Sequence, residues 1–143
     1  MLKKLKVMEK ISNHISYKEA THSPTAVAKG IANEPNAEQL LNMKQVAELV
    51  FEPLRLWYAK PIKINSFFRS ERLNTAVGGA KNSDHKFGRA IDISAGSKAE
   101  NKKLFDWIKQ NVDFDQLINE HDFTWVHVSY HLNKNRKQIL VIK

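Results

Sequence analysis

The sequence contains no cysteine, and this absence excludes several kinds of site. A disulfide bond, a cysteine nucleophile and a zinc site with thiolate ligands all require the missing side chain. Any transition-metal site must therefore be built from histidine, aspartate or glutamate. The chain also lacks an apolar run near the ~20 residues that a transmembrane helix needs. We therefore expect no membrane span.

An export signal is also not expected. The amino terminus, MLKKLKVMEKISNHIS, begins with basic residues. Glu9 and Lys10 interrupt it before an apolar stretch of about 7 to 15 residues can form. We expect a loosely ordered basic segment over residues 1–11, and a cytoplasmic location until something else releases the protein.

Acidic residues are scarce relative to basic ones, with 15 Asp and Glu against 23 Lys and Arg, and a net charge of +8. This charge favours an anionic partner such as nucleic acid, an acidic lipid surface or the bacterial wall. The basic residues are spread along the chain and form no base-reading motif, so we expect no nucleic-acid partner. A length of 143 residues suits a single domain over 1–143, which we expect to be monomeric.

Apolar spacing predicts one long helix early in the chain. Asn36 suits its first cap, and apolar residues recur at steps of three and four up to Trp57, with a kink expected near Pro53. Ser16 with Glu19 forms the pattern of a capping box, and Ser97 with Glu100 suits the start of a second amphipathic helix.

Two predicted strands each place a polar residue between two β-branched residues. The triplets are IDI at 91–93 and VHV at 126–128. Alternate side chains of a strand point to opposite faces, so the β-branched residues enter the core while Asp92 and His127 share the other face. With strands at 62–68 and 138–142, the latter as a closing hairpin, the pattern predicts an α+β fold with a small antiparallel sheet and helices packed on one side.

His85, Asp92 and His127 are the ligand types of a catalytic zinc site, which uses three protein ligands and leaves a position for water. Gly88 permits a tight backbone path between the first two. Each residue also has a structural interpretation when it is considered alone: His85 as a histidine in a loop, and Asp92 as a carboxylate at the end of a strand. Together they favour a metal, because a carboxylate between two isoleucines is costly unless it is paired or metal-bound. The other histidines are expected at the surface: His14, His22, His121 and His131.

The central part of the sequence resembles a known family. The stretch SFFRSERLNTAVGGAKNSDHKFGRAIDIS (66–94) resembles the M15 peptidases, the zinc D-alanyl-D-alanine carboxypeptidase family. The family pattern is an RS pair, then S-x-H-x-x-G-x-A-x-D, then a distant W-x-H. The resemblance covers about residues 12–131, and the opening segment is similar to the small phage and prophage branch. The matching positions are Arg69, Ser70, Ser83, His85, Gly88, Ala90, Asp92, Trp125 and His127.

The resemblance implies a hedgehog/D-Ala-D-Ala peptidase-like fold, with zinc held by His85, Asp92 and His127. It also implies that Arg69 binds a substrate carboxylate, for which a guanidinium is well suited, and that Ser83 lies near the substrate. From the residues alone, Arg69 also reads as a surface cap of its strand and Ser83 as a turn residue.

One departure concerns the general base. Many members place an acid three residues before the last histidine, where this chain has Thr124. The nearest acids upstream are Glu120 and Asp122. We favour Glu120 as the base, because members of the small branch carry a glutamate after a similar strand, with Asp122 second.

The resemblance therefore implies a zinc-dependent hydrolase of peptidoglycan stem peptides that cuts next to a D-amino acid, as a carboxypeptidase or endopeptidase. Cell-wall degradation by a phage or prophage endolysin would suit the lack of an export signal. The alternative is a non-catalytic, zinc-containing wall-binding module of the same fold, which the threonine at position 124 favours.

Overall fold

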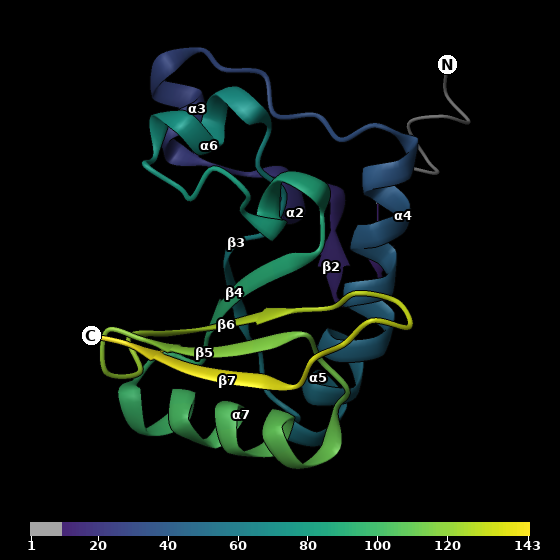
Figure 1. Cartoon of the computed structure of the whole chain (residues 1–143), viewed down its shortest axis with the longest axis vertical. Coiled ribbons are helices and arrows are strands. Elements are labelled where there is room, and N and C mark those ends of the chain that lie inside the picture. The colour runs from purple at the N-terminus through teal and green to yellow at the C-terminus, as the bar shows by residue number, and fades with distance from the viewer. Residues whose placement is uncertain (1–9) are drawn as a thin grey trace.

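A five-stranded sheet in the order β3-β4-β6-β5-β7 forms the centre of the structure, a computed structural model that describes residues 10–143 (Figure 1). Neighbouring strands are antiparallel except β5 and β7, which are parallel. With helices packed against this sheet, the predicted α+β class is confirmed. The strands are β3 (Lys63–Ser66), β4 (Ala90–Ser94), β5 (Gln116–Glu120), β6 (Trp125–Ser129) and β7 (Gln138–Ile142).

The predicted hairpin pairing of residues 138–142 is wrong. Strand β6 already has β4 on one edge and β5 on the other, so neither edge of β6 is free for the last strand. The chain instead crosses at one end of the sheet and adds β7 to the open edge of β5. A crossing of this kind makes the new strand parallel to β5, which itself runs antiparallel to β6.

One long helical segment, predicted from Asn36 onward, has three parts: α4 (Ala37–Val46), a π-helical turn η1 (Ala47–Phe51) and α5 (Glu52–Tyr58). Asn36 caps it, since its side chain accepts a hydrogen bond from the Gln39 N–H. The expected kink near Pro53 takes the form of the π turn, in which the Glu52 N–H donates to the carbonyl of Ala47. A proline ring crowds the preceding helical turn, and a wider turn relieves that crowding.

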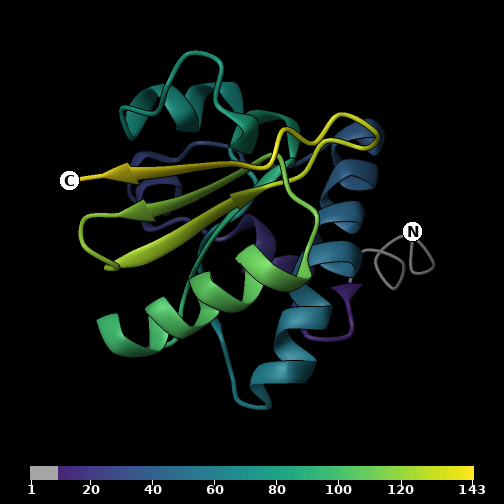
Figure 2. The same ribbon diagram turned by 60° about the horizontal axis from the view of Figure 1, so that its bottom comes forward.

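Helix α7 (Lys98–Asn111), capped by Ser97 as predicted, lies along one face of the sheet, and the long helical segment stands beside it (Figures 1 and 2). Their apolar side chains meet those of the sheet in one core, and burial of each stabilises the fold by roughly 1.5–3 kcal/mol. Within residues 10–143, no helix combines the length and apolar character needed to cross a membrane. The core includes Met43, Val50, Leu54, Ile91, Ile93, Leu104, Ile108, Val126 and Val128.

Short elements cover the other end of the sheet. The pair β1 (Lys10–Ser12) and β2 (Ile15–Ser16) precedes α2 (Tyr17–Thr21), whose predicted capping box between Ser16 and Glu19 is present. Residues 10 and 11 of the expected loose segment belong to β1, and residues 1–9 lie outside the described residues. The remaining elements are α3 (Pro24–Lys29), α6 (Glu71–Ala76) and the 3₁₀ turn η2 (Asp84–Phe87).

Candidate metal centre

Asp92 on β4 lies directly opposite His127 on β6 in the antiparallel register. Opposed residues of such a pair project from the same face, and the Asp92 Oδ1 lies 2.8 Å from the His127 Nδ1. Ile91, Ile93, Val126 and Val128 point to the opposite face and are fully buried. The predicted placement of the aspartate and the histidine on one surface is therefore confirmed.

His85 reaches the same point from η2. Its Nδ1 donates to the carbonyl of Phe67 at 2.8 Å, which leaves Nε2 facing the Asp92 Oδ2 at 3.2 Å. The ring is almost fully buried. Gly88 ends the η2 turn with φ of 74°, and an added Cβ would lie 2.5 Å from the Gln39 carbonyl oxygen. The glycine is required both by its left-handed backbone and by the close approach of α4.

The three side chains perturb one another electrostatically. Burial alone would raise the pKa of Asp92, but the neighbouring imidazoles of His85 and His127 hold it well below its usual range. Burial alone would lower the pKa of His127, but its hydrogen bond to Asp92 and the nearby carboxylates raise it. The carboxylate is thus kept ionised between two nitrogen ligand types.

This donor set fits a divalent transition metal. One ligand atom from each of His85, Asp92 and His127 lies within 4.8 Å of the other two. Two imidazoles and a carboxylate match a catalytic zinc site with a further position open. The Phe67 carbonyl that accepts from His85 is the kind of outer partner that fixes the ring orientation of a metal-binding histidine.

Arg69, three residues beyond the end of β3, lies beside this centre. Its Nη2 is 3.5 Å from the Asp92 Oδ2, its Nε donates to Ser66 Oγ at 3.0 Å and its Nη1 donates to Asn74 Oδ1 at 3.2 Å. The side chain is 18% exposed. A guanidinium has five N–H donors, so these contacts leave one N–H on each of Nη1 and Nη2 for a further acceptor.

Glu120 and Asp122 occupy different positions. Glu120 is opposite Trp125 in the register of β5 and β6, two residues from the pair Ile118 and His127, so it shares the face of His127. Among residues 10–143 its carboxylate makes no ion pair. Asp122 lies in the turn after β5, is highly exposed and pairs with Lys98 at 3.4 Å.

The turn between β5 and β6 has an unusual backbone. His121, Asp122 and Phe123 have φ of 50°, 53° and 59°, a left-handed conformation that costs roughly 1–2 kcal/mol per residue. Two asparagines hold this turn: Asn119 Oδ1 accepts from the Phe123 N–H at 2.6 Å, and Asn101 Nδ2 donates to the Phe123 carbonyl at 2.8 Å.

Ser83 is the cap of η2, and its Oγ accepts from the His85 N–H at 3.2 Å. The turn role left open by the sequence is therefore present.

Trp125, on the face of Glu120 and His127, has a buried Nε1 with no hydrogen-bond partner within the described residues. An unpaired buried donor costs about 1–3 kcal/mol, and a bound acceptor would relieve that cost.

A second cluster lies next to the centre, and the sequence analysis missed it. His131 was expected at the surface, but its Nε2 lies 2.9 Å from Asp84 Oδ1 and 3.8 Å from Asp115 Oδ2. Arg136 already engages both oxygens of Asp115, at 2.9 and 2.8 Å, so this cluster is an ion-pair network rather than a second metal site. His14 is likewise paired, with Glu52 at 2.6 Å. No local pattern reveals such pairs, because their members are far apart in the sequence.

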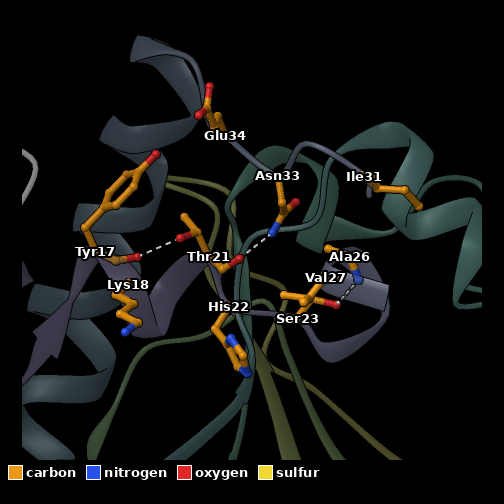
Figure 3. Close-up of a pocket in the computed structure, with 10 residues that line it drawn as sticks. All are labelled: Tyr17, Lys18, Thr21, His22, Ser23, Ala26, Val27, Ile31, Asn33 and Glu34. Atoms are coloured by element: carbon orange, nitrogen blue, oxygen red, sulfur yellow. Dashed lines mark hydrogen bonds between the residues drawn. The ribbon is translucent and has the colours of Figure 1, made fainter. Parts of the chain in front are cut away.

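Two depressions adjoin on the side of Arg69. The nearer, of about 220 Å³, is lined by Ser66, Arg69, Leu73 and other residues of this region. The farther, of about 330 Å³, lies between α2, α3 and the segment that follows α3 (Figure 3). His22 and Ser23 line both, so the two depressions are neighbours.

Two imidazoles and a carboxylate beside an arginine are typical of metal-dependent hydrolases. The sequence profile of the family described as Peptidase M15 matches residues 13–129, and the chain belongs to that family. A segment of 39 residues is 54% identical to the zinc D-Ala-D-Ala carboxypeptidase of Streptomyces albus G. This segment spans 27% of the present chain and 15% of that relative.

Proposed function

We propose that this protein is a zinc-dependent peptidase that hydrolyses a peptide bond next to a D-amino acid in peptidoglycan stem peptides. The observation that carries the proposal is the convergence of His85, Asp92 and His127 on one face of the sheet. Membership of the M15 family supports peptide hydrolysis, and the name of the Streptomyces relative supports the metal and the substrate class.

His85, Asp92 and His127 would hold the zinc ion. When bound, zinc supplies a Lewis acid for the substrate carbonyl and lowers the pKa of bound water towards neutral pH. Hydrogen bonding of His85 Nδ1 to the Phe67 carbonyl keeps the other ring nitrogen directed at Asp92. This preorganisation reduces the entropy lost when the three ligands assemble around a cation.

Arg69 would anchor the substrate chain by a carboxylate. Its two remaining N–H groups suit the bidentate geometry of a guanidinium with a carboxylate. The depression of about 220 Å³ beside Arg69 would receive the adjoining small side chains. Low exposure of the guanidinium strengthens this recognition, because water competes less with the bound anion.

Glu120 would act as the general base, taking a proton from the attacking water and delivering it to the leaving amine. It shares the sheet face of His127, and its carboxylate is not consumed by an ion pair among residues 10–143. The pKa of His127 is raised in part by Glu120, which indicates that the two groups are electrostatically close. Asp122 suits the role less well, because it is exposed and paired with Lys98.

The positive charge of +8 would retain the protein near an anionic bacterial wall, and a phage or prophage lysin is the setting we propose. A second candidate function is a zinc-containing module that binds the wall without hydrolysis. The observation that favours it is Thr124, whose Oγ1 donates to the His121 carbonyl and cannot replace an acid.

Digestion of purified peptidoglycan followed by mass spectrometry of the muropeptides separates the two functions. A peptidase releases terminal D-alanine or shortens the stem peptide by an internal cut. Whichever product wild type forms should be missing with His127→Ala and with Glu120→Gln. Intact muropeptides in the presence of protein that contains stoichiometric zinc would contradict the peptidase and support the binding module.

A further inference from the structure

The side chain of Asn33 holds the backbone on both sides of Arg69. Its Nδ2 donates to the Phe68 carbonyl at 3.0 Å and to the Thr21 carbonyl at 2.9 Å. Its Oδ1 accepts from the Ser70 N–H at 2.7 Å. One amide thus joins the end of α2 to the residues before and after the arginine.

These bonds control the geometry of Arg69 because peptide groups are planar. The Phe68 carbonyl belongs to the peptide plane that precedes the Cα of Arg69, and the Ser70 N–H belongs to the plane that follows it. Two planes fixed in space determine both backbone torsions of the residue between them. They therefore fix the direction in which the arginine side chain leaves the backbone.

Asn33 belongs to the segment between α3 and α4, where the chain turns back over the end of the sheet. Gly30 ends α3 with φ of 62°, and the Ile31 N–H donates to the Ala26 carbonyl, so the chain reverses there. Residues 31–36 then cross towards the first turn of α4 (Figure 1). Figure 3 shows the Asn33 amide directed at Thr21, in the lining of the farther depression.

The guanidinium itself has a polar neighbour at each of its three nitrogens. Ser66 and Asn74 accept from it at 3.0 and 3.2 Å, and the Asp92 carboxylate lies at 3.5 Å. The Asn74 and Asp92 contacts, at 3.2 and 3.5 Å, are long for hydrogen bonds, whereas the bonds of Asn33 to the backbone are 2.7–3.0 Å. The bonds of Asn33 to the backbone are thus among the shortest contacts that support Arg69.

We propose that Asn33 is a positioning residue that aims Arg69 at the substrate carboxylate. This inference rests on the proposed function for the identity of the ligand, but not for the geometry of the arginine. It assigns a role to the segment between α3 and α4, which contributes no metal ligand. The role is specific: loss of the amide should weaken carboxylate recognition and leave metal binding intact.

Kinetics on the zinc-loaded protein test the role. The probes are an acetylated L-Lys-D-Ala-D-Ala peptide with a free terminal carboxylate and the same peptide with a terminal amide. Asn33→Ala should raise KM for the acid about tenfold with a smaller change in kcat, and should change the amide less than about twofold. Asn111→Ala, which removes an exposed asparagine bond on α7, is the control and should resemble wild type.

A double-mutant cycle separates a role through Arg69 from a general loss of structure. In an Arg69→Ala background, Asn33→Ala should cost less than about twofold, because the group that it positions is already gone. Equal losses for both peptides, or a full tenfold loss in that background, would overturn the proposal. Zinc content measured on every variant confirms that the metal centre is unchanged.

A spectroscopic readout keeps the test independent of activity. The Arg69 Nε–H of wild type donates to Ser66 Oγ and should give a sharp, exchange-protected NMR signal. Asn33→Ala should broaden or shift this signal, whereas Asn111→Ala should not. An unchanged signal in Asn33→Ala would overturn the proposal. If neither peptide is hydrolysed by wild type while the signal responds as expected, the proposed function fails and the positioning role stands.

Discussion

Gly79 lies so close to Asn74 that a side chain at Gly79 would overlap the Asn74 Oδ1. This oxygen is the one that accepts from Arg69 Nη1, and the hypothetical Cβ would also come within 3.0 Å of that nitrogen. The Asn74 amide in turn donates to the Ala80 carbonyl at 2.8 Å. The glycine therefore leaves room for a side chain that supports the arginine.

Gly79→Ala should displace Asn74 and loosen Arg69 without touching a metal ligand. We expect stability to fall by about 1–3 kcal/mol, as for other overpacked sites, and KM for a carboxylate-terminated peptide to rise. Thermal unfolding and steady-state kinetics measure the two effects. Gly96→Ala is the control for glycine replacement, since nothing lies within 4 Å of its added Cβ, although its φ of 98° carries its own backbone strain. A Gly79→Ala protein with unchanged KM would contradict the role of Asn74.

Metal content should depend on the three clustered side chains of His85, Asp92 and His127 and not on other histidines. Wild type purified with zinc should contain about one ion per chain, and His85→Ala should retain less than about a tenth of that, because two ligands hold zinc poorly. Elemental mass spectrometry provides the measurement. His22→Ala removes an exposed histidine away from the cluster and should keep the metal. Equal zinc in both variants would refute the assigned ligands.

Substitution of the two candidate bases, Glu120 and Asp122, should lower kcat to clearly different extents. Glu120→Gln preserves the size of the side chain and should lower kcat by about 10²–10⁴-fold with zinc retained. Asp122→Asn should remain within about threefold of wild type, because its exposed pair with Lys98 contributes little. Rates on the acetylated tripeptide decide the matter. A larger loss in Asp122→Asn than in Glu120→Gln would transfer the role to Asp122.

Acid should destabilise the fold partly through Asp115. The bidentate Arg136 guanidinium lowers the pKa of Asp115 against the burial that would raise it. A depressed pKa contributes stability that is present above the unfolded value of about 3.9 and is lost as pH falls through the folded value. Asp115→Asn should therefore lose about 1–2 kcal/mol near neutral pH and show a shallower loss below about pH 4.

Chemical denaturation of wild type and Asp115→Asn over a pH series measures that difference. Asp113→Asn is a suitable control, because Asp113 is exposed and its carboxylate accepts a hydrogen bond from Asn135 rather than from an arginine. Parallel pH profiles for wild type and Asp115→Asn would exclude the ion pair as a source of acid sensitivity.

Local patterns were sufficient to predict the features that depend on neighbouring residues. Period-two alternation at 91–93 and 126–128 predicted which side chains enter the core, and the register confirms that Asp92 faces His127. Cap patterns at Ser16, Asn36 and Ser97 predicted helix starts, since a cap bonds to a backbone group only three residues away.

Features that depend on distant segments were not predictable in this way. The parallel placement of β7 follows from which sheet edge remains open, a property of the whole topology. The pairing of His131 with Asp84 spans 47 residues, and the contact of Asn33 with Ser70 spans 37. Nothing in the immediate neighbourhood of either residue distinguishes it from an ordinary polar side chain of a loop.

The left-handed turn between β5 and β6 limits which insertions and deletions this sequence can tolerate. Inserting or deleting one residue there would slide one strand past the other by a single position. Glu120 and His127 would then no longer lie on the same face of the sheet, and aliphatic groups now packed against α7 would face water. Length in this hairpin is thus constrained more tightly than composition, even though the turn itself carries neither a proposed ligand nor the favoured base.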